Sequence, residues 1–383
     1  MSLWVDAQQP SCLNELDYHP DITHRLQRIA KTSGEGNVTS ENGFPHLLFT
    51  GPIGAGKRTR VSALLRDLYQ SNLTEQKRLR LEYKSVKIND SKTIEVTVLS
   101  SPYHIELNLS EVGSTNDRVV IMTLIREIAE STSISTKVIV GDQNEDSKDV
   151  AVRPSFRVLV LHQVELLSRG AQQALRRTME KYVKSCRLIL IASGGSGTGR
   201  IIAPIRSRCL EIRVPAPNDY EIEELLLRTL RTQGEAADKA AASLIPTILD
   251  QAGGDLRKAL LLLESYWRND KQAIEFPWKM ALQNICQKIK KEQTPKQLSD
   301  LRTNVYDLLQ SCVPGEIIIK EVCLHFCACM SVRKGSDDAI SETVRAAAEY
   351  ERNIHLGTRA VVHVEAFFAT LMSILKKFNL ELR

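Results

Sequence analysis

The chain has 383 residues, enough for about two or three domains. Apolar residues make up 43% and charged residues 25%, as in soluble globular proteins, and no stretch approaches the length of a membrane span. The net charge of +5 permits contact with nucleic acid without requiring it. The eight cysteines include no C-x-x-C pair, which argues against a structural zinc site and favours a reduced, intracellular compartment.

A short apolar strand, a glycine-rich turn and a helix follow one another over residues 44–68. This order is typical of a phosphate-binding loop, because glycines let successive N–H groups face phosphate oxygens and the helix N-terminus adds partial positive charge. Lys57 is expected to reach the β- and γ-phosphates. The alternative is a structural turn that binds nothing. The predicted loop consists of Gly51, Pro52, Ile53, Gly54, Ala55, Gly56, Lys57, Arg58 and Thr59.

The loop departs from the usual pattern at the residue after Lys57. A Ser or Thr is required there, because its hydroxyl ligates Mg²⁺. This chain has Arg58, and Thr59 comes one residue late. One residue along a helix is a rotation of roughly 100°, so Thr59 is not a simple substitute. Binding of Mg²⁺ is therefore doubtful.

Strands that alternate with helices predict an α/β domain with a parallel sheet over residues 1–215. Residues 156–161 and 186–191 are near-continuous apolar runs, typical of parallel strands buried on both faces. After Pro217 the pattern becomes helical. We predict a small helical lid domain over residues 216–270 and an all-α domain over residues 271–383.

A phosphate-loop ATPase needs two acids after a second strand, one for Mg²⁺ and one to polarise the attacking water. The corresponding positions here are His162 and Gln163. Imidazole is a poor ligand for Mg²⁺, and an amide orients water but cannot accept its proton. Glu165 lies too far along, and we interpret it as a solvated residue that opens the next helix.

Two sets of segments carry a resemblance that covers nearly the whole chain. The first set is residues 3–6, 45–48, 174–182, 186–190 and 205–210, and the second is residues 100–106, 116–121 and 363–367. The first set resembles the small subunits of eukaryotic replication factor C, a five-subunit AAA+ clamp loader. The second set narrows the resemblance to the branch at the closing end of the spiral, called subunit five in budding yeast and subunit three in humans.

The resemblance assigns roles to individual residues. Arg208, in Ser207-Arg208-Cys209, matches an arginine finger that reaches the γ-phosphate bound by the neighbouring subunit. Arg257 matches the lid arginine that touches the subunit's own nucleotide. The segment that contains Val5 packs against adenine in relatives, although here it continues with Ala7-Gln8-Gln9-Pro10. Ser193 stands where many members have a sensor asparagine.

The resemblance also implies contacts with primer–template DNA and with the sliding clamp. Basic residues on the equivalent helices follow the DNA backbone; the matching residues here are Arg118, Arg176, Arg177 and Lys181. A solvated helix face or an interface salt bridge is an equally good interpretation of each. Most of the apolar stripe over residues 121–129 should be core, and a few of its residues could anchor a clamp.

Taken with the resemblance, these residues imply a clamp-loader subunit that is not an enzyme on its own. It is expected to hold ATP or ADP without hydrolysis, or no nucleotide, and to supply Arg208 to its neighbour. Its expected partners are the other replication factor C subunits, the clamp PCNA, DNA and the large subunits of alternative loaders, in the nucleus. The alternatives are a freestanding phosphate-loop ATPase or kinase and a shared scaffold subunit of checkpoint loaders.

Overall fold

The computed structural model describes most of the chain, namely residues 3–34, 44–69, 80–89, 92–101, 104–112, 116–139, 156–183, 185–194, 200–232, 239–268, 276–331, 337–357 and 359–378. These residues belong to two compact units, Met1–Gln272 and Ala273–Arg383. The finer division of the first unit into a phosphate-loop domain and a lid stays a prediction. No helix within the described ranges is long and apolar enough to cross a membrane.

The first unit is built on a seven-stranded sheet in the order β2-β3-β4-β5-β6-β1-β7. The strands from β4 to β7 along this order are parallel, whereas β2 and β3 pair antiparallel at one edge. This confirms the predicted parallel α/β sheet. The strands are β1 (Leu47–Gly51), β2 (Arg80–Asn89), β3 (Lys92–Ser100), β4 (His104–Asn108), β5 (Arg157–His162), β6 (Cys186–Ser193) and β7 (Leu210–Arg213).

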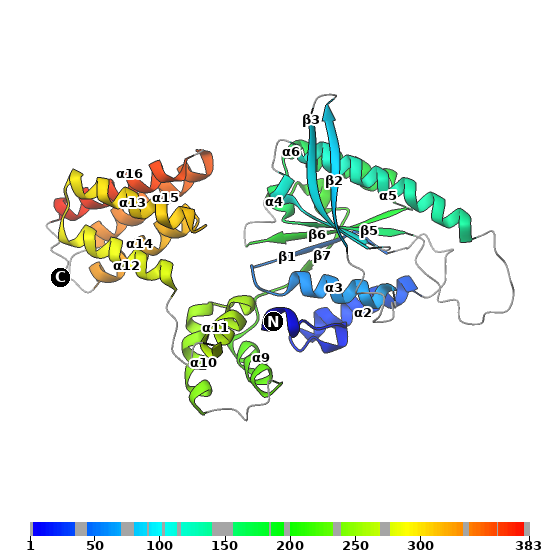
Figure 1. Ribbon diagram of the computed structural model, residues 1–383, viewed down its shortest axis with the longest axis horizontal. Helices are drawn as coiled ribbons and strands as arrows, with labels where there is room; N and C mark the ends of the chain where they lie inside the picture. The colour runs from blue at the N-terminus through cyan, green and yellow to red at the C-terminus, as the bar shows by residue number, and fades with distance from the viewer. Residues whose placement is uncertain are drawn as a thin grey trace. The chain divides into compact units, whose positions relative to one another are not determined.

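Helices cover both faces of this sheet, α5 and α6 on one side and α2 and α3 on the other (Figure 1). Successive residues of the central strands alternate between the two cores: in β5, Val158 faces one and Leu159 the other. The helices here are α1 (Trp4–Ala7), η1 (Leu13–Glu15), α2 (Pro20–Gly34), α3 (Lys57–Tyr69), α4 (Leu109–Val112), α5 (Asp117–Ile139), η3 (Val164–Leu166), α6 (Arg169–Lys181) and α8 (Ala203–Arg206).

The register of the parallel strands brings the ends of four strands together at the phosphate loop. Gly51, the last residue of β1, pairs with Ser193 at the end of β6. Asn108 at the end of β4 pairs with His162 at the end of β5. Ligands of open α/β sheets bind at this carboxyl edge, because the loops that leave the strands meet there. The edge is therefore the place to look for a site.

Three further helices complete the first unit, α9 (Asp219–Thr232), α10 (Lys239–Ala252) and α11 (Leu256–Arg268). The N-terminal segment is bound to them. The buried Trp4 donates its backbone N–H to Glu264 Oε2 at 2.8 Å, and its ring centroid lies 6.3 Å from that of Trp267. The Thr229 hydroxyl donates to Gln8 Oε1 at 2.7 Å. These contacts hold the start of the chain against α9 and α11.

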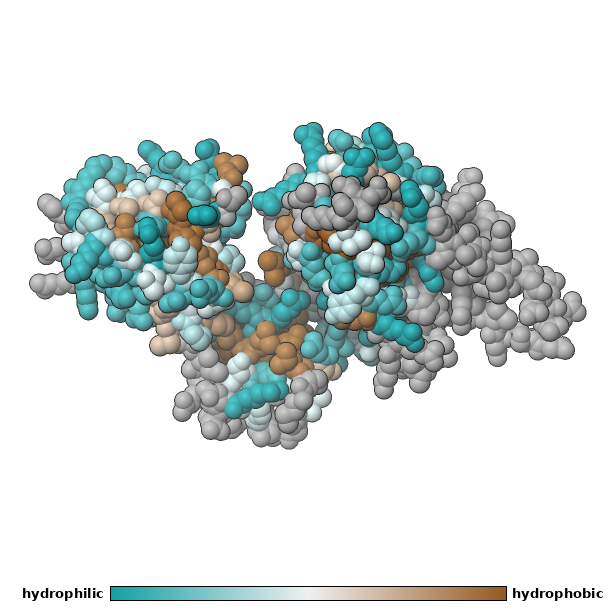
Figure 2. Space-filling model, turned by 45° about the horizontal axis from the view of Figure 1, so that its top comes forward, coloured by the Kyte–Doolittle hydropathy of each residue, from teal (hydrophilic) through white to brown (hydrophobic). Residues whose placement is uncertain are grey.

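The second unit is helical, with α12 (Pro277–Lys291), α13 (Pro295–Gln310), α14 (Gly315–Ser331), α15 (Asp337–Leu356) and α16 (Ala360–Lys377). Its core includes the fully buried Phe326 and Phe367. The visible face of this unit also carries apolar surface between polar areas (Figure 2). The large apolar side chains exposed on these helices are Met280, Tyr306, Ile317, Leu324, Val344, Leu356 and Val362.

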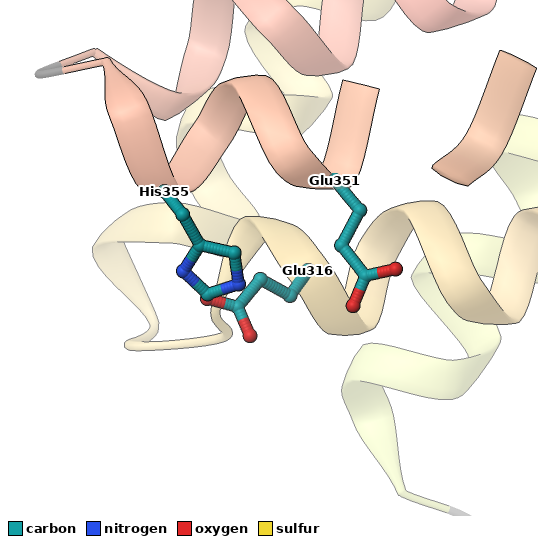
Figure 3. Close-up of side chains that lie close together, drawn as sticks. All are labelled: Glu316, Glu351 and His355. Atoms are coloured by element: carbon teal, nitrogen blue, oxygen red, sulfur yellow. The ribbon is translucent and has the colours of Figure 1, made fainter. Parts of the chain in front are cut away.

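A small charged cluster lies at the surface where α14 meets α15. Glu316 comes from the start of α14, and Glu351 and His355 come from α15 (Figure 3). His355 Nδ1 lies 3.3 Å from Glu316 Oε1, and both side chains are 43% exposed. An ion pair this exposed stabilises a protein by at most about 1 kcal/mol. We interpret the cluster as a surface contact between the two helices.

Candidate functional site: a phosphate loop and its strand edge

The predicted phosphate loop forms at the end of β1, and α3 begins at Lys57. Gly54 and Gly56 have φ angles of +77° and +75°, a backbone region that glycine enters without strain. The buried Lys57 side chain folds back over the loop: its Nζ donates to the carbonyl oxygens of Gly51 at 2.8 Å and Pro52 at 2.6 Å. Loop and lysine therefore have the geometry of a phosphate-binding turn.

The start of α11 is docked directly on this loop. The Asp255 carboxylate lies against Gly54, where a Cβ atom would come within 1.9 Å of Asp255 Oδ1. The same oxygen accepts the Lys258 N–H at 3.1 Å and so caps the helix. Arg257 stands between these two residues and lines the same cavity as the loop. The lid arginine predicted from sequence is therefore beside the loop.

The loop, the strand ends and α11 enclose a cavity of about 1310 Å³, above the roughly 300–1,000 Å³ of typical ligand pockets. Most predicted nucleotide-binding residues line it; Gly51 and Pro52 instead hold Lys57 through their carbonyls. The predicted residues that line the cavity are Val5, Ile53, Gly54, Ala55, Gly56, Lys57, Arg58, Thr59 and Arg257. The structure thus brings the predicted set together.

Glu106, which the sequence analysis did not single out, gathers three basic groups at the strand edge. Its Oε2 atom lies 3.2 Å from Arg58 Nη2 and 3.1 Å from His162 Nε2. Its Oε1 atom lies 3.6 Å from His104 Nε2. All four side chains line the cavity. The two residues that replace Mg²⁺ ligands, Arg58 and His162, therefore share one carboxylate.

Electrostatics differ between the two sides of the cavity. Burial alone would raise the pKa of Glu106, but hydrogen bonds from His104 and His162 and the charge of Arg58 hold that pKa well below its usual range. Burial lowers the pKa of Lys57; Arg257 adds to this shift, while Glu165 and Asp255 oppose it. Glu106 is therefore ionised at neutral pH.

The residues at this edge do not fit Mg²⁺. The ion prefers six oxygen ligands in octahedral geometry and usually binds through carboxylates, phosphates and water. Arg58 puts a positive charge where a hydroxyl is needed, and His162 puts an imidazole where a carboxylate is needed. Glu106 is already engaged by both. We therefore assign no step of any reaction to a metal ion here.

Glu165 corrects one interpretation made from sequence, because it is not a solvated residue. Gln163 adopts a left-handed conformation, with φ of 57°, which turns the chain sharply after β5. The turn brings the Glu165 Oε1 atom to the Ser193 N–H at 3.0 Å, and its Oε2 atom is buried with no hydrogen-bond partner in the described part of the chain. Glu165 thus braces the ends of β5 and β6, and its charge acts on Lys57.

The predicted arginine finger, Arg208, lies outside the cavity, two residues after α8. Its Nε donates to Glu180 Oε1 at 2.8 Å, and its Nη1 donates to the Pro204 carbonyl at 2.9 Å. Arg176 Nε lies 3.7 Å from the same Glu180 oxygen. The side chain of Arg208 is 34% exposed. Arg208 is therefore an oriented surface arginine, linked through Glu180 to α6.

The predicted DNA-binding residues lie on α5 and α6, and all four are exposed. The starts of the two helices are joined: Asp117 Oδ2 accepts the Ser168 N–H at 2.6 Å, and its Oδ1 accepts the Ser168 hydroxyl at 3.1 Å. The exposed Arg169, which the sequence analysis missed, therefore lies at the joined starts of α5 and α6, as Arg118 does. A serine N-cap directly before Arg169 was the available signal. The predicted residues are Arg118, Arg176, Arg177 and Lys181.

The apolar stripe on α5 is core rather than clamp-facing surface. Ile121, Leu124, Ile125 and Ile128 are each at most 2% exposed and pack with the strands of one sheet face. This confirms the expectation that most of the stripe is core, and it leaves these four residues unavailable to anchor a clamp. The stripe is buried because α5 covers the sheet with this side.

Comparison with known proteins adds near-full-length similarity to one family. A family model described as replication factor C subunit 3, C-terminal domain, matches residues 278–379. The probable replication factor C subunit 3 of Dictyostelium discoideum is 39% identical, over 98% of this chain and 99% of the relative. Subunit 3 of Mus musculus is 36% identical over 99% and 97%. Subunit 5 of Saccharomyces cerevisiae is 33% identical over 97% and 99%.

Proposed function

This chain belongs to the replication factor C small-subunit family, and from that premise we propose that it works in a five-subunit clamp loader that places the clamp PCNA on primer–template DNA. The observation that carries the proposal is similarity along almost the whole chain to replication factor C subunits 3 and 5. The partners are then the other subunits, PCNA and DNA, and the place of action is the nucleus, in replication and repair. Large subunits of alternative loaders are further partners under this proposal.

The nucleotide site of this subunit, we propose, holds ADP or ATP without hydrolysing it. The phosphate loop, Lys57 and Arg257 support binding, because they offer backbone N–H groups and two positive charges to phosphates. His162 and Gln163 argue against hydrolysis: neither supplies the carboxylate that activates water. The chain is then a nucleotide-holding subunit rather than an ATPase by itself.

Arg208 acts in trans under this proposal, as an arginine finger on the γ-phosphate of the neighbouring subunit. A guanidinium placed there stabilises negative charge as it develops during phosphoryl transfer. Its contacts with Glu180 and Pro204 support this role, because they orient a partly exposed arginine before any neighbour arrives. Arg208 is the one catalytic residue that we assign to the chain.

DNA contact is assigned to the exposed arginines and lysine of α5 and α6, which would meet phosphates rather than base edges. The joined starts of α5 and α6 support DNA contact by Arg118 and Arg169 in particular, because the Asp117–Ser168 hydrogen bonds hold the two helix N-termini next to each other. Arg176 competes with Arg208 for Glu180, so we rank it below these two.

The second unit is assigned to assembly with the other subunits. Its helices expose several large apolar side chains, among them Leu356 at 76% and Val362 at 56%. Apolar surface of this kind marks sites of protein contact, because burying it removes it from water. The match of residues 278–379 to the family's C-terminal domain supports the same assignment.

The test of this proposal is a reconstituted five-subunit complex that carries Arg208→Ala. We expect normal assembly by size-exclusion chromatography and a loss of clamp-stimulated ATP hydrolysis of about tenfold or more. The control is Arg206→Ala, an exposed arginine two residues away that contacts Glu211 at 3.3 Å. Unchanged hydrolysis and clamp loading with Arg208→Ala would remove the finger assignment.

The freestanding ATPase alternative is tested with the purified chain. We expect no hydrolysis above a blank, because the strand edge lacks the carboxylates for it. Turnover that disappears in Lys57→Met would favour the freestanding enzyme instead.

A further inference from the structure

The cluster around Glu106 occupies the part of the cavity where other phosphate-loop proteins hold Mg²⁺. Arg58 directly follows Lys57, at the position of the metal-binding hydroxyl, and His162 ends β5, at the position of the first acid. Both reach the same Glu106 oxygen, at 3.2 and 3.1 Å. The substitutions are thus linked in space, although the three residues lie on three different elements.

We propose that this cavity binds free nucleoside di- or triphosphate without Mg²⁺, with the Arg58 guanidinium in the place of the metal ion. The inference rests on the proposed nucleotide binding and specifies the form of the ligand. The ligand is the uncomplexed polyphosphate anion rather than its magnesium complex.

Arg58 has the donors for this role. Its side chain is 57% exposed and lines the cavity, while Nη2 contacts Glu106. A guanidinium has five N–H donors in a rigid fork, so one contact leaves others for phosphate oxygens. Glu106 is 8% exposed and ionised, and it therefore fixes the direction of the guanidinium from inside the protein. The arginine is oriented before a ligand binds.

A magnesium ion would have to displace this arrangement. It would lose a hydroxyl and a carboxylate ligand relative to an ordinary site and would come close to a permanent positive charge. It would also compete with Arg58 and His162 for Glu106 Oε2. Because Mg²⁺ gives up its hydration water reluctantly, no gain offsets these costs. The pocket should therefore prefer the metal-free anion.

The remaining positive charge comes from the loop side of the cavity. Lys57 and Arg257 face the same space as Arg58, and α3 presents its N-terminus there. These groups act on any polyphosphate, whether it has two phosphates or three. The site should therefore accept ADP and ATP alike and should leave both intact.

The experiment is a fluorescence titration of the purified full-length chain with mant-ADP, in EDTA and in excess MgCl₂. We expect a dissociation constant in EDTA that is lower than, or within about twofold of, the value in MgCl₂. Arg58→Ala should raise the value in EDTA about tenfold. Arg126→Ala, an exposed arginine of α5 away from the cavity, is the control and should leave it unchanged.

A second variant is designed to restore Mg²⁺ binding in place of the Arg58 guanidinium. Arg58→Thr combined with His162→Asp restores the two missing oxygen ligands, and binding should become about tenfold tighter in MgCl₂ than in EDTA. Circular dichroism of each variant checks folding, and Arg58→Gln replaces Arg58→Ala if that variant unfolds.

The outcomes separate this inference from the function it rests on. A wild-type dissociation constant about tenfold or more higher in EDTA than in MgCl₂ overturns the metal-free site and leaves nucleotide binding intact. Equal binding by Arg58→Ala and the wild type in EDTA removes Arg58 from the site. Absence of mant-ADP binding in both buffers ends nucleotide binding and this inference together, while the role of Arg208 is unaffected.

Discussion

The two sides of the cavity beside the phosphate loop are built differently. On the loop side, the backbone supplies most of the features on which the proposed nucleotide binding rests: the glycine conformations, the start of α3 and the carbonyls that hold Lys57. On the strand side, the proposed function depends on which side chains β4 and β5 carry, and there Glu106, in the middle of β4, contacts His162 at the end of β5. Phosphate can be held by backbone geometry alone, whereas hydrolysis depends on a few carboxylates and can be lost without loss of the fold.

The largest expected effect is on the loop side. Lys57→Met removes the buried ammonium and should weaken mant-ADP binding about a hundredfold, since charged hydrogen bonds contribute about 1.5–3 kcal/mol each. Lys84→Met on β2, whose Nζ contacts Glu127 at 2.7 Å, is the matched control. Binding that is unchanged in Lys57→Met would remove the lysine from the phosphate contacts.

On the strand side, the next expected effect is on stability rather than binding. Glu106→Gln leaves Arg58 and His162 without their shared carboxylate and should lower the free energy of unfolding by about 1–3 kcal/mol at pH 7, measured in urea. Glu95→Gln, an exposed position on β3, should change it by less than about 0.5 kcal/mol. Equal stability of Glu106→Gln and wild type would show that the cluster is not structural.

The same variant has a pH signature. The pKa of Glu106 is lower in the folded than in the unfolded chain, so its contribution is complete above the unfolded value of about 4.3 and is lost as pH falls below it. The stability gap between wild type and Glu106→Gln should therefore begin to narrow below about pH 5 and keep narrowing on further acidification. A gap that widens on acidification would contradict the lowered pKa.

Arg257 tests whether a side chain from another element adds to binding on the loop side, because it lines the cavity with the loop but lies on α11. Its side chain is exposed, so a charge–charge contribution of about 1 kcal/mol, or about a fivefold change in the dissociation constant of mant-ADP, is expected for Arg257→Ala. Arg231→Ala, exposed in the last turn of α9, is the control. An unchanged constant with Arg257→Ala would remove the lid arginine from the site.

The smallest expected effect concerns the turn after β5. Gln163 is held in a left-handed conformation, which costs a non-glycine residue about 1–2 kcal/mol. Gln163→Gly should relieve it and raise the free energy of unfolding by about 0.5–1 kcal/mol, after the entropy cost of glycine. Gln163→Ala is the control, because alanine keeps the cost of the left-handed conformation and removes only the amide side chain. A destabilised Gln163→Gly would mean that the amide side chain supports the edge.

Some features of the site were predictable because they are local in sequence. The loop from Gly51 to Lys57 and the helix after it could be read directly, since turn glycines and helix periodicity act over a few residues. For the same reason, the sequence alone showed that Arg58 stands where a Ser or Thr is needed and that His162 stands where an acid is needed. The pairing of Arg58 with Glu106 was not, because 48 residues and two strands separate them.

Glu106 itself offered a weak signal. It stands between Ile105 and Leu107 in a short strand, and an acid at such a place is either exposed or paired. Which of the two holds depends on the neighbouring strand, and here the pairing of β4 with β5 brings His162 to it. Glu165 was misjudged similarly: its direction follows from the left-handed turn at Gln163, which propensities do not reveal.

By itself, the sequence determined the α/β class, the glycine-rich loop before α3 and the residues at which this loop and β5 differ from the usual phosphate-loop pattern, because these follow from residue type and short spacings. Only the tertiary structure decided that Arg58 and His162 share one carboxylate and that Glu165 turns inward. The physical reason is that burial and ion pairing depend on which strands lie side by side. That arrangement is set by packing across the whole sheet rather than by any one segment.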